Sequence, residues 1–131
     1  MKIIQINATC GAGSTGKICV AVSKLLSDAG IENYILYSNG NSQYSNGIKY
    51  TTDSSIKSQA LSSRIRGNYG FNSVSATKKL LRLMDKIQPD IVHIHNLHGH
   101  NCNLQLLFEY LKKRHIKCFW TFHDCWAFTA Y

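Results

Sequence analysis

The chain has 131 residues, 44% of them hydrophobic and 11% aromatic, which indicates one globular domain with a sizeable core rather than a disordered segment. Its net charge of +8 predicts attraction to an anionic partner such as nucleic acid, anionic lipid or a phosphorylated substrate. No apolar run reaches the roughly 18 residues of a membrane-spanning helix. A signal peptide is not expected either, because Gln5 and Asn7 interrupt the first apolar run.

The five cysteines are odd in number and form no C-x-x-C pair. This usage is typical of reduced thiols in a cytosolic protein, where most cysteines act as small core residues.

The first segment, from Lys2 to Ala29, predicts a strand, a glycine loop and a helix. A β-branched run made by Ile3, Ile4 and Ile6 is typical of a strand covered on both faces. The apolar residues after the loop recur at helical spacing, and Gly30 ends the helix. They are Ile18, Val22, Leu25, Leu26 and Ala29.

The loop between this strand and helix contains Gly11, Gly13 and Gly16, and Ser14 and Thr15 offer hydroxyls that suit an N-cap. Free backbone N–H groups at a helix start suit a phosphate or a sugar hydroxyl. Gly11, Gly13 and Ser14 are therefore candidate substrate-binding residues.

Two phosphate-binding motifs nearly match this loop. Residues 11–16 satisfy the dinucleotide pattern G-x-G-x-x-G, but the second strand ends in Ser38-Asn39-Gly40 without the acid that would hold a ribose. Residues 11–17 also satisfy the start of a P-loop, yet Ile18 stands where Ser or Thr should ligate magnesium. The third interpretation, a tight turn that lets the helix pack, stays open beside these two.

The middle of the chain begins with a second strand at Glu32–Tyr37. From residue 38 to 63 the sequence is polar, with one weak strand candidate at residues 48–50. A helix from about Ser73 to Gln88 follows, and it carries an apolar stripe on one face. The stripe consists of Leu80, Leu83, Met84 and Ile87.

A second stripe on this helix is basic and consists of Lys78, Arg82 and Lys86. We expect it to meet an anionic membrane surface, with Arg64 and Arg66 adding charge nearby. A merely solvated helix face is the alternative interpretation.

The last third of the chain predicts a strand at residues 91–95, a helix from about Asn103 to Arg114, and a strand at residues 116–122. Strands separated by helix-length connections predict an α/β fold, with a Rossmann-like parallel sheet and flanking helices. Ligands of such sheets bind at the carboxyl ends of the strands, so we expect the polar segments after three strands to converge there. These segments are residues 7–16, 95–100 and 123–126.

Several histidines cluster between residues 93 and 100, with Cys102 close by. Their spacing lacks the helical H-x(3–5)-H pair and C-x-x-C partner of a zinc site, so we expect no metal. His93, flanked by Val92 and Ile94, is predicted to lie deeper than His95 as a hydrogen-bonded core residue. The loop that includes His98 is expected to bind a polyol or a phosphate.

Two strings make the sequence resemble one family closely: P-D-I-V-H-I-H-N-L-H-G at residues 89–99 and T-F-H-D-C-W-A-F-T at residues 121–129. They look like the N-terminal domain of bacterial family-4 glycosyltransferases that build capsule, colanic acid or other exopolysaccharide. The resemblance implies a GT-B architecture, in which two Rossmann-like domains flank the catalytic cleft.

The resemblance also implies roles for individual residues. His123 matches the family's histidine that reaches hydroxyls of the transferred sugar, and it is our candidate catalytic residue. His95 and Asn96 would line the acceptor side, and Gly13 would approach the donor phosphate or the site of attack. From their positions beside His123, we expect Asp124 to orient a neighbouring group and Trp126 to offer a flat face to a sugar ring.

The resemblance implies that a nucleotide-sugar donor is held mainly by an E-x7-E pair in a second domain. This chain has only two glutamates, Glu32 and Glu109, so the pair is not present. We therefore expect residues 1–131 to be an acceptor-side domain from a truncated or shortened protein, inactive in sugar transfer by itself.

The expected function is retaining transfer of a hexose to a polysaccharide precursor on a lipid-linked or glycan acceptor, without metal or other cofactor. Nucleic acid is not an expected partner. The expected location is cytoplasmic, with peripheral attachment to the inner face of the membrane. The alternative function is a non-catalytic module that binds glycan or a membrane surface.

Overall fold

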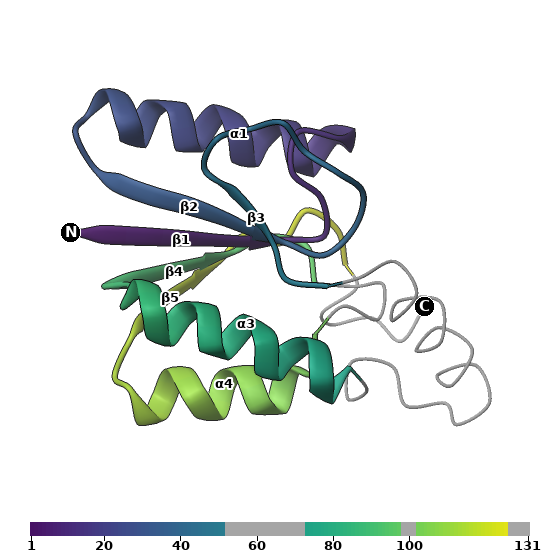
Figure 1. Cartoon of the computed structure of the whole chain (residues 1–131), viewed down its shortest axis with the longest axis vertical. Helices are drawn as coiled ribbons and strands as arrows, with labels where there is room; N and C mark the ends of the chain where they lie inside the picture. The colour runs from purple at the N-terminus through teal and green to yellow at the C-terminus, as the bar shows by residue number, and fades with distance from the viewer. Residues whose placement is uncertain (52–72, 98–101, 126–131) are drawn as a thin grey trace.

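A five-stranded sheet lies at the centre of the computed structural model, which describes residues 1–51, 73–97 and 102–125 (Figure 1). The strands are β1 (Lys2–Asn7), β2 (Glu32–Tyr37), β3 (Gly47–Lys49), β4 (Ile91–Ile94) and β5 (Lys117–Trp120). All four neighbouring pairs are parallel, in the order β3-β2-β1-β4-β5. The predicted α/β class with a Rossmann-like parallel sheet is confirmed.

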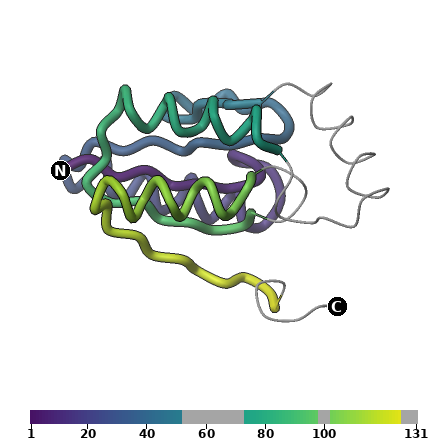
Figure 2. The backbone as a smooth tube through the Cα atoms, turned by 90° about the horizontal axis from the view of Figure 1, so that it is seen from below, coloured from purple at the N-terminus to yellow at the C-terminus, as the bar shows by residue number. Residues whose placement is uncertain are grey.

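Helices cover both faces of the sheet. They are α1 (Gly13–Asp28), α3 (Val74–Ile87) and α4 (Leu104–Lys113). In Figure 1, α1 lies on one side of the sheet and α3 and α4 lie together on the other. Figure 2 shows α3 and α4 side by side, with β5 at the outer edge of the sheet. None of the helices in the described part of the chain is long and apolar enough to cross a membrane.

The larger apolar core lies between the sheet and the α3–α4 pair. Ile4 and Ile6 of β1 point into it and are fully buried. The predicted apolar stripe of α3 packs here, with Leu80 and Met84 fully buried. Full burial of each such side chain contributes about 1.5–3 kcal/mol, so this face supplies most of the hydrophobic stabilisation.

The face of α1 that meets the sheet is not the predicted one. Ile18 and Leu25 are 42% and 69% exposed, whereas Gly16, Cys19 and Ser23 are buried. The strands beneath α1 present buried amides, Gln5 of β1 and Asn33 of β2, beside apolar side chains such as Ile35. An unpaired buried amide costs about 1–3 kcal/mol, so the helix turns the groups that can pair these amides inward.

Asn33 on β2 shows how this pairing works. Its Nδ2 donates to the carbonyl oxygen of Ser23 at 3.2 Å and to Ser27 Oγ at 3.0 Å, and Ser23 Oγ donates to Asn33 Oδ1. Because these hydrogen bonds hold the inward face of α1, the spacing of apolar residues alone does not identify that face.

The start of α1 also differs from the prediction. Its N-cap is Ala12, which offers no side chain for capping, and not Ser14 or Thr15. The loop is instead closed by its own backbone, since the Gly11 N–H donates to the Gly16 carbonyl oxygen at 3.0 Å. Gly11 and Gly13 have φ values of +77° and +67°, a region that disfavours residues with a Cβ. The tight-turn interpretation of this loop is thus confirmed.

Gly16 is required by close packing rather than by its φ angle. A Cβ there would lie 2.6 Å from Thr9 Oγ1 and 3.2 Å from the backbone nitrogen of Gly11. We expect Gly16→Ala to lower the free energy of unfolding by about 1–3 kcal/mol, as overpacking typically does, despite the better helix propensity of alanine. Urea denaturation followed by circular dichroism measures this.

A matched control removes the nearest obstacle. In the Thr9→Ala/Gly16→Ala double variant the 2.6 Å contact is gone, so the loss should be smaller than the sum of the two single losses. Strictly additive losses would contradict the packing explanation.

The remaining expectations differ in detail. The weak strand candidate at residues 48–50 is β3, shifted by one residue, and β5 ends at Trp120, two residues earlier than predicted. All five cysteines are free, as predicted, and three of them are buried. Arg64, Arg66, His98 and Trp126 lie outside the described residues.

Candidate functional site

Three strand exits meet at one edge of the sheet, at the carboxyl ends of β1, β4 and β5 on the right of Figure 1. From β1 the chain adds β2 and β3 on one side of the sheet and then β4 and β5 on the other. The edge between β1 and β4 is therefore the switch point, where such folds bind ligands. Two backbone hydrogen bonds extend the ladder beyond the strands. The His95 N–H donates to the Ile6 carbonyl oxygen, and the Thr121 N–H donates to that of Ile94, both at 2.9 Å.

Asn7, the last residue of β1, ties two of these exits together. Its Oδ1 accepts from the backbone N–H of Asn96 at 3.1 Å, and its Nδ2 donates to the Thr9 carbonyl oxygen at 2.8 Å. Asn7 is fully buried, so these bonds fix the segment after β4 against the start of the glycine loop. The predicted convergence of the strand exits is observed here.

His95 and His123 are brought together from different strands. Nδ1 of His95 lies 3.0 Å from Nε2 of His123, and the two ring planes differ by only 16° with centroids 5.3 Å apart, the arrangement of two rings joined edge to edge. His95 is only 3% exposed, whereas His123 is exposed. The buried ring therefore supports a ring that solvent and ligands can reach.

Gln5 holds the other side of His95. Its Oε1 lies 3.0 Å from His95 Nε2, and its Nε2 donates to the Cys19 carbonyl oxygen of α1 at 3.0 Å. Gln5 is completely buried. Sequence reasoning missed Gln5 as a site residue and placed Asn7 in the polar segment at the strand exit without giving it a role, although two amides alternating with isoleucines in one strand were a visible signal.

The electrostatics of this cluster favour neutral imidazole. Burial, followed by the nearby His93 and His123, lowers the pKa of His95 to about 4. Burial and then His123 also lower the pKa of His93. At neutral pH His95 is therefore uncharged and carries a single ring proton.

His93 occupies a shallower position than predicted. It is half-buried, whereas His95 is almost fully buried, so the expected order of depth is reversed. The prediction that His93 is hydrogen-bonded is confirmed, since its Nε2 lies 2.8 Å from Thr121 Oγ1. The covering helix explains the reversal, because α1 packs on β1 and β2 and β4 lies beside that covered strip.

The glycine loop forms the neighbouring part of the edge. Gly11, Gly13 and Ser14 are exposed there, and Asn7 Nδ2 also approaches Thr15 Oγ1 at 3.4 Å. Asp124 is exposed next to His123. The structure thus joins His95 directly to His123 and connects Asn96 to the loop through Asn7.

The end of β2 argues against a dinucleotide site. The backbone N–H groups of Ser38 and Asn39 both donate to the Ala8 carbonyl oxygen, at 3.2 and 2.7 Å. Ser38 and Asn39 stand where a ribose-binding acid would be expected, and their backbone N–H groups instead anchor the chain that follows β1.

Cys19 and Cys102 are buried thiols with little nucleophilic character. Burial raises the pKa of Cys19 and of Cys102 to about 12, so these thiols stay protonated and are poor nucleophiles. Residues 1–51, 73–97 and 102–125 contain no group of three or more His, Cys, Asp or Glu side chains placed to hold a metal ion.

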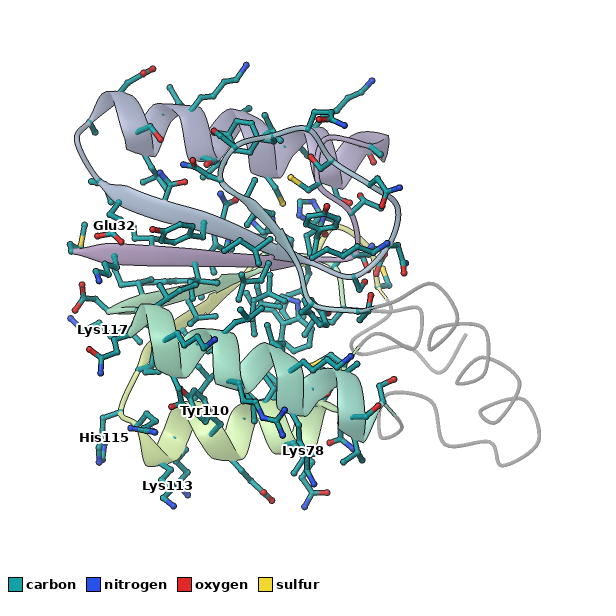
Figure 3. All side chains as sticks on the ribbon, viewed as in Figure 1. Glu32, Lys78, Tyr110, Lys113, His115 and Lys117 are labelled. Carbon is teal, nitrogen blue, oxygen red and sulfur yellow. The ribbon has the colours of Figure 1, made fainter. Side chains whose placement is uncertain are left out.

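A basic groove lies away from this edge, between α3 and α4. Its lining consists of Lys78, Leu81, Arg82, Asp85, Tyr110, Lys113 and Arg114. Figure 3 shows Lys78 and Tyr110 where α3 and α4 meet, and Lys113 on the side of α4 that is away from the sheet. Two of the three residues in the predicted basic stripe line the groove, and Lys86 does not.

Within the basic groove one cation is neutralised. Arg114 pairs with Asp85 at 2.6 Å, and the Tyr110 hydroxyl donates to the same carboxylate oxygen at 3.0 Å. The charge that the groove presents to solvent therefore comes chiefly from Lys78, Arg82 and Lys113.

Comparison with protein families gives one match, to Glycosyltransferase Family 4 over residues 16–131. The matched region begins at Gly16 and includes α3, β4, α4, β5 and His123, while β1 and the first part of the glycine loop precede it. No individual curated protein matches the chain. Because the family match covers most of the chain and the fold is the expected Rossmann-like one, the chain belongs to glycosyltransferase family 4.

Proposed function

We propose that residues 1–131 form the acceptor-side domain of a glycosyltransferase of GT-B architecture. The enzyme transfers a hexose from a nucleotide sugar to a polysaccharide-precursor acceptor, and we propose that this acceptor is lipid-linked. The observation that supports this best is the His95–His123 pair at the switch-point edge, beside the Asn7–Asn96 bond.

The proposed reaction is a transfer with retention at the anomeric carbon. The bond between the anomeric carbon and the donor phosphate oxygen breaks, and the leaving nucleoside diphosphate keeps the electron pair. The acceptor hydroxyl oxygen forms the new bond on the same face and loses its proton to the departing phosphate. His123 hydrogen-bonds a hydroxyl of the transferred hexose and so aligns the anomeric carbon.

Neither of the two glutamates, Glu32 and Glu109, lies at the site. Glu32 lies at the start of β2, at the opposite end of the sheet from His123, where it pairs with Lys2 at 3.7 Å (Figure 3). Glu109 accepts from Gln105 on the exposed surface of α4. We therefore propose that the donor-binding glutamates come from a segment outside these 131 residues.

This division of labour predicts that the 131-residue chain alone does not transfer sugar. Stabilisation of the leaving phosphate is commonly the largest electrostatic contribution to such a reaction, and here it would come from the other domain. With UDP-glucose as the donor probe and UDP release as the readout, we expect the same rate as without protein.

The control adds a donor-binding domain. The same 131 residues joined to a family-4 donor domain should release UDP in an acceptor-dependent manner. Robust acceptor-dependent turnover by the 131 residues alone would contradict the proposed division. Binding of glycans with no turnover in the joined form would instead favour a non-catalytic binding module.

We further propose that the basic groove meets the anionic surface of the membrane that holds the acceptor, on its cytoplasmic side. Near such a surface each lysine or arginine contributes about 1 kcal/mol. Lys78→Gln/Arg82→Gln should therefore weaken binding to vesicles of phosphatidylglycerol and phosphatidylcholine by about tenfold or more, as measured by co-sedimentation.

The matched control for the vesicle experiment removes the same charge from the other side of the molecule. Lys17 and Lys24 are exposed on α1, so Lys17→Gln/Lys24→Gln should change binding little. As a single substitution, Lys86→Gln should also weaken binding less than Lys78→Gln or Arg82→Gln alone, because Lys86 does not line the groove. Equal losses in all variants would indicate a response to net charge only.

A further inference from the structure

A continuous chain of hydrogen bonds links helix α1 to the exposed ring of His123. It runs from the Cys19 carbonyl oxygen to Gln5, from Gln5 to His95, and from His95 to His123, and every step is 3.0 Å long. Gln5 and His95, the two inner members, are 0% and 3% exposed. Water therefore has little access to substitute for any step inside the chain.

The direction of these bonds is fixed at the Cys19 end. A backbone carbonyl oxygen only accepts, so the atom of Gln5 beside it has to be the NH2 group. The amide oxygen of Gln5 is then left facing His95 Nε2, which has to be the protonated nitrogen of that ring.

The same logic continues to His123. Since His95 is neutral and its single proton is on Nε2, its Nδ1 carries a lone pair and accepts. The donor for this bond is then Nε2–H of His123. In the neutral form of His123 the remaining nitrogen, Nδ1, has no proton.

We infer that Gln5 and His95 are positioning residues that hold His123 as the Nε2–H tautomer, so that its Nδ1 acts as a hydrogen-bond acceptor. Where the ligand is the hexose of the proposed function, this inference rests on that function. The hydroxyl at the contact then donates to His123 and keeps its own oxygen lone pairs for other partners.

This polarity has a consequence for sugar selection. If His123 Nδ1 accepts the hydrogen bond, the sugar must supply a hydroxyl hydrogen. If it were instead an N–H donor, a fluorine substituent could replace the hydroxyl as the acceptor. Loss of the relay would allow the His123 ring to rotate and change tautomer, which should lower kcat more than it raises KM.

The direct test is nitrogen-15 NMR of the 131-residue chain at pH 7.5, with no ligand present. We expect His123 Nε2 to have the shift of a protonated ring nitrogen, Nδ1 that of an unprotonated one, and a scalar coupling across the bond between His123 Nε2 and His95 Nδ1. A protonated Nδ1 on neutral His123, or no coupling between the rings, would overturn the inference.

Gln5→Met tests the origin of the polarity, because methionine has a similar shape and no amide. The coupling should disappear and both rings should show mixed tautomers, while Asn33→Asp, which alters another buried amide under α1, should leave the coupling intact. An intact coupling in Gln5→Met would show that Gln5 does not set the polarity. Thermal melting checks the fold, and the unmodified chain still decides the tautomer if a variant unfolds.

The enzymatic test uses the chain joined to a donor domain, with UDP-glucose analogues altered at C3, C4 or C6, away from the anomeric carbon. At the hydroxyl that contacts His123, the deoxy and fluoro analogues should both lose about tenfold or more in kcat/KM. A fluoro analogue as good as UDP-glucose where the deoxy analogue fails would show that His123 donates. No turnover with any donor would count against the proposed function and leave the NMR result to decide the tautomer.

Discussion

Replacing His123 by alanine, in a form that carries a donor domain, should lower kcat about 10²-fold while the protein stays folded and its melting temperature falls by only a few degrees. The expected decrease in kcat follows from the loss of one oriented hydrogen bond that is made mainly in the transition state. His123 is exposed, but its Nε2 is the partner of the buried His95 Nδ1, so its removal should lower the free energy of unfolding by about 1–3 kcal/mol and leave the protein folded. Steady-state kinetics and thermal melting on the same sample measure both effects.

A second exposed histidine provides the control. His115 lies between α4 and β5, at the end of the sheet opposite to His123 (Figure 3), and has a φ of 53°. His115→Asn keeps a residue that tolerates this backbone conformation and should leave kcat unchanged. If His123→Ala leaves kcat unchanged too, or loses activity only through unfolding, His123 belongs to the scaffold and not to the site.

The fold could be predicted because its strong signals are local. The β-branched run at residues 3–6 and the apolar stripe of α3 specify a buried strand and an amphipathic helix without help from distant residues. Helix-length connections between strands then require a parallel sheet with crossovers. The element ends were less certain, as the early end of β5 at Trp120 shows, because edge strands fray where one neighbour is lacking.

The site could be predicted only in part. The strand exits and the family strings predicted that His95 and His123 lie near each other, and they do. Gln5 was taken only as an interruption of an apolar run and Asn7 as the start of the polar strand exit, yet both are buried and connect the site to its surroundings. Their partners are up to 90 residues away in the sequence, so no local pattern shows that these amides are satisfied.

The inward face of α1 was predicted wrongly for the same reason. Apolar periodicity favours the face with Ile18 and Leu25, but α1 instead turns Cys19 and Ser23 toward buried amides and the apolar Ile35 of the sheet. Buried polar networks are a general case in which the sequence pattern and the packing disagree.

The stability of this domain should fall markedly as the pH drops from about 6.5 to about 4. In the unfolded chain a histidine has a pKa of about 6.5, whereas burial beside His93 and His123 lowers the pKa of His95 to about 4. Between these values the unfolded state binds a proton that the folded state does not, so protonation favours unfolding. The stabilisation is complete above pH 6.5 and is lost as the pH falls toward 4.

For His95 alone, linkage predicts a loss of about 2 kcal/mol between pH 7.5 and pH 5. His93 adds to the loss in the same direction, since its pKa is also lowered. Carboxylates stay mostly ionised down to pH 5, so this window reports mainly on histidine. Urea denaturation at pH 7.5, 6 and 5 gives the free energies of unfolding directly.

The variant that isolates the effect is His95→Asn, whose amide retains a donor and an acceptor but does not titrate. Its stability at pH 7.5 should be lower than that of the unmodified chain, because the bonds to Gln5 and His123 are disturbed. Its decline from pH 7.5 to pH 5 should nevertheless be smaller, since the contribution of His95 is gone while that of His93, whose pKa is also lowered, remains. An equally steep decline in His95→Asn would show that His95 is not held neutral. The conclusion that the single ring proton of His95 lies on Nε2 would then lose its basis.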